Sequence, residues 1–262
     1  MDRIGHVGVV VPVHNEEQHL ARALNGVRVA ANALQAGQPH VGVTMVVVLD
    51  SCTDGSRRIA ARFAAADTRL SMLEVAFRNV GKSRRAGIEA LLASRPVAAC
   101  PSAARPSSAG PYSLPLPGPR LWLANTDADS CVPVNWLQRQ VGLADAGADA
   151  VLGTVEPDPD GMDPEILRRW RARHPFEENH AHVYGANFGV RASAYELAGG
   201  FPRQRSHEDR GLVENLHRHG FAVRATDSIR VLTSGRLHAR APHGFGAYLL
   251  ALGLEPAVAL ES

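Results

Sequence analysis

The sequence predicts an α/β protein with a parallel central sheet flanked by helices. Two observations lead to this prediction. Short β-branched runs alternate with amphipathic segments through the first 94 residues, and polar residues follow directly after the apolar runs. A β-α-β-α-β-α order calls for parallel strands joined by right-handed crossovers. Ligands bind beyond the carboxyl ends of the strands in such sheets, so the polar residues there are candidate site residues.

The first elements follow one another closely. Residues 7–13 form a β-branched run typical of a buried strand, and 16–34 carry apolar residues at the spacing of one helix face. Asn15 is expected to cap that helix, because its side chain can accept a hydrogen bond from a free N–H of the first turn. Further strands are predicted at 43–49 and 70–77, and further helices at 56–66 and 82–94.

A proline-rich segment at 96–120 interrupts the alternation. It holds seven of the seventeen prolines and has no periodicity, so a flexible insertion is expected there. The pattern resumes afterwards with a strand that starts at Leu121. The elements expected beyond it are helices at 133–146, 164–173, 193–199 and 208–219, and strands at 148–155, 184–191, 223–225 and 229–232.

Composition excludes several classes of function. The net charge is +2 and aromatic residues make up 5%, which argues against a surface for nucleic acid. Three cysteines without C-x-x-C spacing favour neither a disulfide framework nor a zinc site. No leader and no apolar stretch of about 20 residues is visible, so a cytoplasmic protein without an integral membrane segment is expected. One domain spanning residues 1–262 is predicted.

Two carboxylates end the apolar run that starts at Leu121. Asp127 and Asp129 are two residues apart, and in an extended strand such side chains point the same way. Converging carboxylates repel each other unless a cation lies between them, and Mg²⁺ or Mn²⁺ prefers oxygen ligands. These ions usually keep positions open for phosphates, which suggests a substrate with a diphosphate. A pair of solvated aspartates in a loop is the alternative.

Seven sequence blocks in order resemble the family 2 glycosyltransferases, which have the GT-A fold. The blocks are residues 9–16, 47–56, 79–87, 126–130, 185–191, 199–201 and 208–209. The resemblance implies a GT-A fold with a Rossmann-like central sheet that is mixed but mostly parallel and flanked by helices. It also implies a nucleotide-binding half at 1–130 and an acceptor-binding half at 131–262.

The resemblance implies a nucleoside-diphosphate sugar, linked to UDP or GDP, as the donor. It puts the nucleoside against the turn from Pro12 to Glu16, with Glu16 near the ribose and Asp50 near the base. A basic residue at the start of the third helix suits the phosphates, and Lys82 and then Arg85 match the family pattern best, whereas Arg84 is expected on a solvated face. The implied donor-binding residues are Pro12, His14, Asn15, Glu16, Asp50, Lys82, Arg85 and Asp127.

The resemblance also implies a metal cofactor and a catalytic acidic pair. Mn²⁺ or Mg²⁺ is held by Asp127, Asp129 and a late histidine, His238 or alternatively His243, and assists departure of the nucleoside diphosphate. Asp209 takes the proton of the acceptor, and Glu208 orients Asp209 or the acceptor. Gly185, Ala186 and Asn187 are the implied acceptor-binding residues. The Arg- and His-rich segment 233–240 is expected near the diphosphate or an anionic acceptor.

The resemblance implies transfer of a single sugar, because the Gln/Arg-x-x-Arg-Trp motif and the membrane helices of processive synthases are absent. It implies inversion, because Asp209 would act as a base on the face opposite the leaving group. Two alternatives stay open: a retaining enzyme resembling glucosyl-3-phosphoglycerate synthase, and a non-catalytic protein that binds nucleotide sugars. Nucleotidyltransferases and dinucleotide oxidoreductases are disfavoured because no glycine-rich loop follows the first strand. The acceptor is not identified, and a homodimer is compatible with the sequence.

Overall fold

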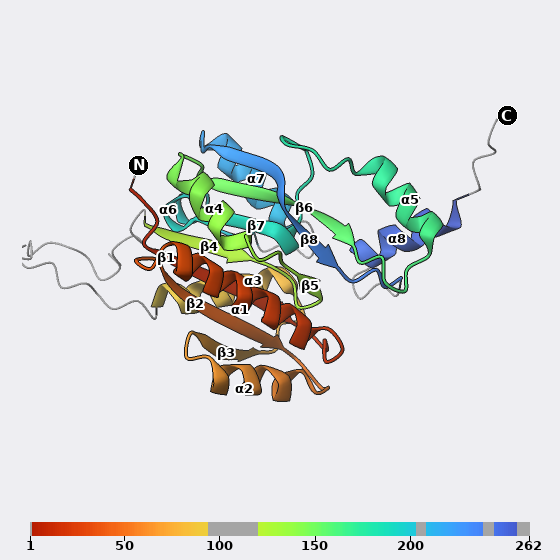
Figure 1. Ribbon diagram of the computed structural model, residues 1–262, viewed down its shortest axis with the longest axis horizontal. Helices are drawn as coiled ribbons and strands as arrows, with labels where there is room; N and C mark the ends of the chain where they lie inside the picture. The colour runs from red at the N-terminus through yellow and green to blue at the C-terminus, as the bar shows by residue number, and fades with distance from the viewer. Residues whose placement is uncertain (1, 94–119, 203–207, 238–243, 256–262) are drawn as a thin grey trace, which may run out of the picture.

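The computed structural model describes residues 2–93, 120–202, 208–237 and 244–255, and its centre is a sheet of eight strands (Figure 1). The strand order is β3-β2-β1-β4-β7-β6-β8-β5. The predicted mixed, mostly parallel α/β architecture is confirmed, with β7 antiparallel to both of its neighbours and β5 antiparallel to β8. The strands are β1 (His6–Val13), β2 (Gly42–Asp50), β3 (Leu70–Val75), β4 (Leu121–Asn125), β5 (Ser130–Cys131), β6 (Ala150–Pro157), β7 (Phe188–Arg191) and β8 (Val223–Thr233). Almost all of the predicted insertion at 96–120 lies outside the described residues.

Helices cover both faces of the sheet. Because side chains alternate along a strand, Val9 and Val11 of β1 join one apolar cluster while Val10 joins the other. The first cluster includes α1 (Leu20–Gly37), α2 (Ser56–Ala66) and α4 (Trp136–Asp145), and the second includes α3 (Val80–Ala93), α6 (Ala192–Leu197) and α7 (Glu208–Arg218). Burial on both faces explains why the first strands are continuous apolar runs.

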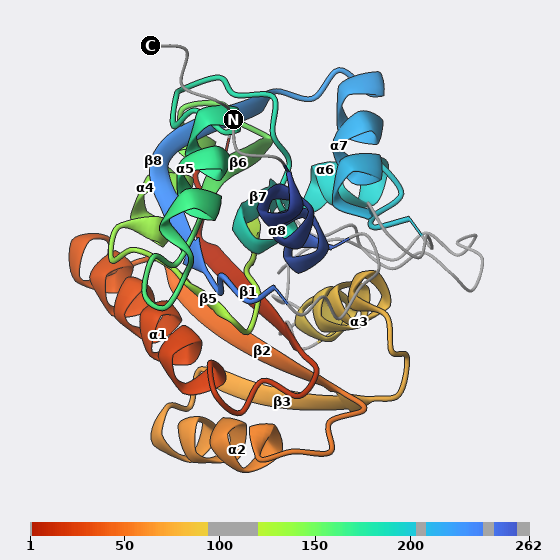
Figure 2. The same ribbon diagram turned by 90° about the vertical axis from the view of Figure 1, so that its right-hand side faces the viewer.

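Two further helices pack against each other beyond the carboxyl ends of β6 and β8 (Figures 1 and 2). They are α5 (Pro164–Arg173) and α8 (Phe245–Leu254), joined by a separate apolar cluster that includes Trp170 and Leu249. The bounds of α5 are those predicted, because Asp163 caps the helix and a proline occupies its first position. The described helices include none with the length and apolar character needed to cross a membrane.

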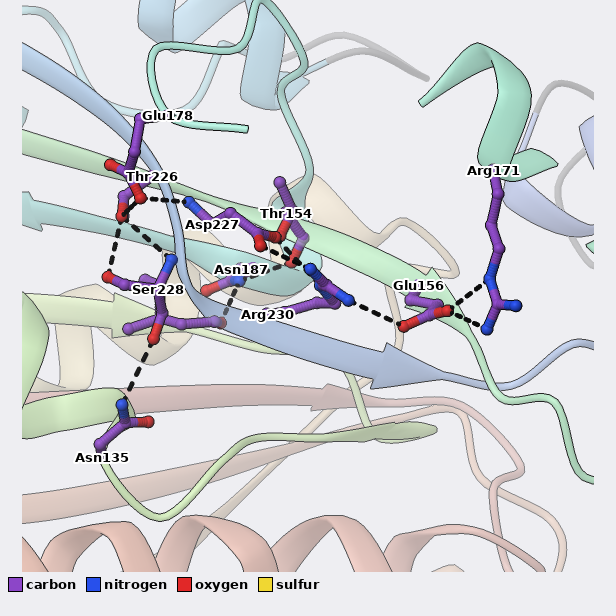
Figure 3. A network of polar contacts seen from close by, with 11 residues as sticks. Asn135, Thr154, Glu156, Arg171, Glu178, Asn187, Thr226, Asp227, Ser228 and Arg230 are labelled. Atoms are coloured by element: carbon purple, nitrogen blue, oxygen red, sulfur yellow. Dashed lines mark hydrogen bonds and ion pairs between the residues drawn. The ribbon is translucent and has the colours of Figure 1, made fainter. Parts of the chain in front are cut away.

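The two strands predicted at 223–225 and 229–232 form one bulged strand, β8. The register with β6 moves from Gly153↔Thr226 to Val155↔Val231 across the bulge. Figure 3 shows how side chains hold it: Asp227 accepts hydrogen bonds from Thr154 and Arg230, and Arg230 also pairs with Glu156, which Arg171 of α5 contacts in turn. A bulge re-aims the strand after it.

Re-aimed in this way, β8 ends at the turn that follows β4. Ser130 and Cys131 of β5 pair with the last residues of β8, and the hydroxyl of Ser130 donates to Thr233 at 2.8 Å. The end of β8 and the short strand β5 therefore meet beside Asp129, which precedes β5.

Candidate active site

A cavity of about 550 Å³ lies at the carboxyl ends of β1, β2 and β4. The structure brings together several predicted residues on its walls: Pro12, His14, Glu16, Asp50, Asp127 and Asp129. The start of α3, the end of β8 and the first residues of α8 complete the lining. This is the edge of the sheet at which a ligand site was expected from the strand order.

The loops after β1 and β2 are tied together by side chains. Asn15 has a left-handed backbone (φ 52°), and its Oδ1 accepts hydrogen bonds from the backbone N–H of Thr53 at 2.7 Å and of Asp54 at 3.3 Å. Glu17 accepts from the N–H of Gly55 at 2.8 Å. The prediction that Asn15 caps α1 is therefore wrong, and α1 begins only at Leu20. Asn15 does not line the cavity; it joins the loop after β1 to the loop after β2.

Asp50, predicted to contact the base, organises the start of α3. Its Oδ1 accepts from the N–H groups of Phe77 and Arg78 at 2.8 Å, and its Oδ2 accepts from the N–H of Asn79 at 3.0 Å and the hydroxyl of Ser83 at 2.8 Å. Burial raises the pKa of the Asp50 carboxyl, but these donors outweigh it and hold the pKa below its usual value. Asp50 thus anchors α3 to β2 as an ionised carboxylate at the cavity wall.

Arg84 links three segments of the site. Its side chain is buried, with Nη2 2.5 Å from Asp127 Oδ1 and Nη1 2.5 Å from Glu208 Oε1. Burial lowers the pKa of the guanidinium, but the two carboxylates more than offset this and the pKa stays above its ordinary value. Gly185 makes room for it, because a Cβ there would lie 2.4 Å from Nη1.

The prediction that Arg84 is on a solvated face is wrong, and the two basic residues preferred from the family pattern lie elsewhere. Lys82 is exposed and does not line the cavity. Arg85 is also outside the cavity lining and pairs with Glu89 one helical turn away. Arg84 is therefore the cationic side chain that α3 contributes to the described cavity wall.

The two aspartates that follow β4 belong to a turn, not to the strand. β4 ends at Asn125, so strand alternation does not bring Asp127 and Asp129 together; the turn places both on the cavity wall. Asp127 pairs with Arg84, and Asp129 Oδ2 lies 2.8 Å from Nη2 of Arg236. Burial and the nearby Asp127 raise the pKa of Asp129 to about 6, although Arg236 opposes the shift.

The residues present fit a divalent cation of the magnesium type. The pKa of Asp129 stays raised even beside Arg236, so the negative charges of Asp127 and Asp129 are not fully compensated by that arginine. Mg²⁺ and Mn²⁺ are commonly held by one or two carboxylates together with substrate phosphates and water. No group of three or more His, Cys, Asp or Glu side chains suited to a metal occurs within the described ranges, so an all-protein cage is not available there.

The acidic pair at the start of α7 splits between two environments. Glu208 is buried and bonded to Arg84, whereas Asp209 accepts from the N–H of Gly185 at 2.8 Å and from the N–H of Arg210 at 2.8 Å. Asp209 thereby ties α7 to the turn before β7. It does not line the 550 Å³ cavity. It lies close enough to Arg84 for its negative charge to help raise the pKa of that guanidinium.

The residues predicted to bind an acceptor are buried. Ala186 and Asn187 belong with Gly185 to a 3-10 turn, η1 (Gly185–Asn187), that replaces the first part of the predicted strand 184–191. The amide of Asn187 accepts from Trp136 and donates to the carbonyls of Thr154 and Ile229. Its side chain is therefore engaged in the core and is not free to contact an acceptor.

The late histidines proposed as a third metal ligand, His238 and His243, lie outside the described residues. His180 and His182 are part of an aromatic group with Tyr184 and His174, next to α5 and α8. Burial and the neighbouring His180 lower the pKa of His182, which favours its neutral form. A neutral, stacked imidazole is in keeping with a packing role.

Comparison with known proteins supports the same family. Residues 8–93, from β1 to α3, match the family model for glycosyl transferase family 2, which confirms the resemblance seen in the sequence over that range. No curated protein matches the chain in sequence.

Solved structures share the fold at low sequence identity. Residues 1–349 of S. aureus TarS align with a TM-score of 0.57 at 13% identity, over 88% of this chain and 60% of that one. The mannosyltransferase PcManGT from Pyrobaculum calidifontis, in complex with GDP-Man and Mn²⁺, gives 0.60 at 17% identity, over 91% and 59%. Glucosyl-3-phosphoglycerate synthase from M. tuberculosis gives 0.51 at 14%, over 95% and 79%. The chain thus spans less than two thirds of TarS and PcManGT, and its GT-A fold is confirmed.

Proposed function

We propose that this chain, whose residues 8–93 match glycosyl transferase family 2, transfers a single sugar from a nucleoside-diphosphate sugar to an acceptor and depends on Mn²⁺ or Mg²⁺. One observation carries the proposal: two carboxylates, Asp127 and Asp129, share the wall of a strand-end cavity with basic Arg84 and Arg236. A volume of about 550 Å³ suits a ligand of this size. The GDP-Man and Mn²⁺ bound to PcManGT support the same class of donor.

The donor's nucleoside would lie against the loop after β1. Glu16 is a buried carboxylate on the cavity wall and suits ribose hydroxyls, which are hydrogen-bond donors. His14 is exposed at the same wall, and its ring nitrogen is 2.6 Å from the carbonyl of Asp50. We assign both residues to the nucleoside, with Asp50 holding the start of α3 beside them.

Asp127 and Asp129 would hold the divalent cation, which supplies Lewis-acid stabilisation of the charge on the departing diphosphate. The contribution of the chain itself is positioning. Arg84 fixes one oxygen of Asp127 and leaves the other for a ligand, and Thr233 and Ser130 contact Asp129 Oδ1 at 3.4 and 3.3 Å. Both aspartates therefore meet the donor with defined orientations.

Asp209 would accept the proton of the attacking hydroxyl. Each of its oxygens carries one backbone N–H donor, which leaves acceptor capacity on both. Glu208 is locked to Arg84 and so serves to position the start of α7. A base separate from the metal-binding carboxylates favours inversion at the anomeric carbon, because attack then comes from the face opposite the leaving group.

The test begins with the donor. A thermal-shift series of nucleotide sugars with Mn²⁺ identifies the donor, because a ligand of the folded state raises the melting temperature. Asp129→Ala is expected to abolish the Mn²⁺-dependent part of that shift. Asp209→Asn is expected to keep it while kcat falls about 10²- to 10⁴-fold. Glu214→Gln, an exposed change on the same helix as Asp209, is the matched control.

NMR of the product then gives its anomeric configuration. A retained configuration, or an Asp209→Asn protein with wild-type turnover, would rule out Asp209 as the base. An Asp129→Ala protein that keeps the Mn²⁺-dependent part of the shift would rule out the metal site.

A further inference from the structure

Arg236 lies between two acidic residues of the cavity that come from different segments. Its Nη1 and Nη2 each donate to one oxygen of Glu16 at 2.8 Å, and Nη2 is also 2.8 Å from Asp129 Oδ2. The side chain of Arg236 is 28% exposed, whereas those of Glu16 and Asp129 are 7% and 14% exposed. The guanidinium therefore covers both carboxylates on the solvent side.

We propose that Arg236 exchanges partners during donor binding: it neutralises Glu16 and Asp129 in the metal-free cavity, and it moves to the donor's phosphates once a divalent cation and the nucleoside diphosphate are bound. This inference rests on the proposed function and adds a diphosphate-binding residue to it. Arg236 thus contacts Glu16 and Asp129 in the first state and the phosphates of the donor in the second.

Competition for one oxygen is the first argument. Asp129 Oδ2 is the oxygen that Arg236 approaches, and Asp129 is also a proposed cation ligand. A guanidinium at 2.8 Å and a divalent cation at the same oxygen repel each other and cannot both occupy that side of the carboxylate. Cation binding therefore favours release of Arg236 from Asp129.

The second argument is that released Arg236 remains at the cavity. The N–H of Ser234 donates to the carbonyl of Asp129 at 3.1 Å, and the N–H of Arg236 is 3.4 Å from the Ser234 hydroxyl. The backbone is thus tied to the turn after β4 while the long side chain changes its contacts. A diphosphate in the same cavity offers the negative charge that Arg236 has given up, and the planar guanidinium matches phosphate geometry.

Arg84 provides an internal contrast. It also bridges two carboxylates, but it is buried and confined by the backbone at Gly185. Of the two arginines that bridge carboxylates on the cavity wall, Arg84 is therefore fixed, whereas Arg236 is partly exposed and able to exchange; Arg78, which also lines the cavity, is exposed. Arg22, which pairs with Asp158 nearby and is 57% exposed, contacts neither Glu16 nor Asp129 and is a suitable control.

The test measures two affinities in the purified chain. Binding of Mn²⁺ alone is followed by electron paramagnetic resonance of the free ion. Binding of UDP and of GDP at saturating Mn²⁺ is followed by calorimetry. Arg236→Gln is expected to bind Mn²⁺ alone about tenfold more tightly and the preferred nucleotide about tenfold more weakly, since one charge-assisted contact is lost in each state. Arg22→Gln is expected to change neither affinity by more than about twofold.

Opposite shifts in the two affinities distinguish an exchange from a structural role, which would weaken both. If Arg236→Gln shifts both affinities in the same direction, or neither, the exchange is wrong while the proposed function stands. If the wild-type chain binds neither UDP nor GDP with Mn²⁺, the proposed function itself fails. Arg236→Lys keeps the positive charge but lacks the planar guanidinium. An Mn²⁺ affinity close to that of the wild type, together with weaker nucleotide binding, supports the exchange.

Discussion

Removing the cation at Arg84 should destabilise the whole chain, because two carboxylates depend on it. Arg84→Met keeps most of the apolar stem and removes the guanidinium. Glu208 then has a buried charge, with a side chain only 6% exposed, while Asp127 is 33% exposed and can be rehydrated. Breaking a buried ion pair by deleting one partner costs about 3–5 kcal/mol. Because only Glu208 is strongly buried, we expect the lower value, about 3 kcal/mol.

Thermal unfolding followed by circular dichroism measures this loss. For a chain of this length, about 3 kcal/mol corresponds to a melting temperature lower by roughly 6–12 °C. Arg85→Met is the matched control: the neighbouring arginine forms an exposed pair with Glu89 on the same helix, worth about 0.3–0.5 kcal/mol. Adding Glu208→Gln to Arg84→Met removes the buried charge and should recover about half of the loss.

Two results would refute this reasoning. One is an Arg84→Met protein that melts within about 2 °C of Arg85→Met, since a buried bridge and a surface pair would then be equivalent. The other is a double variant no more stable than Arg84→Met alone. That outcome would mean that the lost stability comes from packing of the stem and not from the uncompensated carboxylate.

Three further predictions concern the site and the core. Burial and Asp127 raise the pKa of Asp129 to about 6, so below that pH a cation has to displace a proton. Mn²⁺ affinity in the presence of UDP or GDP should therefore fall about tenfold per pH unit below 6 and stay level above 7, and calorimetry showing a flat profile down to pH 5 would contradict it. Asn187→Ala should cost about 3 kcal/mol or more in urea unfolding, because three buried partners lose their hydrogen bonds, and a wild-type midpoint would contradict this. Gly142→Ala, at an exposed helix position with open space, should stabilise by about 0.5–1 kcal/mol. Gly189→Ala should destabilise by about 1–3 kcal/mol, because its Cβ would lie 2.1 Å from Gln140, and equal melting temperatures of these two variants would be the contrary result.

Local patterns located most of the helices and strands. The helix α5 has the bounds predicted for a short basic helix, and the structure shows why they are sharp: Asp163 caps it and a proline occupies its first turn. The helix α2 was predicted equally well at 56–66. The cavity lies at the edge of the sheet where the sequence predicts a site, and the reason is general, since parallel strands that begin together also end together.

What the sequence did not predict depends on contacts between distant segments. Asn15 has the appearance of a helix cap, but its amide bonds to a loop 38 residues away. Residues 82–85 include three basic side chains, and only that of Arg84 is buried. It is buried because Glu208 pairs with it and Gly185 leaves space for it, and both residues come more than a hundred positions later in the sequence. The apolar run at 245–254, without a charged residue, was the one available signal for α8, and the sequence prediction did not use it.

The position of β1 in the sheet has a consequence for how the chain matures on the ribosome. β1 pairs with β2 on one side and with β4 on the other, but β4 is synthesised only from Leu121 onward. A nascent chain that ends at α3 therefore presents an apolar, valine-rich strand with an open edge, which is a template for pairing with other chains. Fragments limited to the first three strands should precipitate on expression, and extension through Asn125 should not restore their solubility, because the far edge of β4 stays open until β7 has been synthesised.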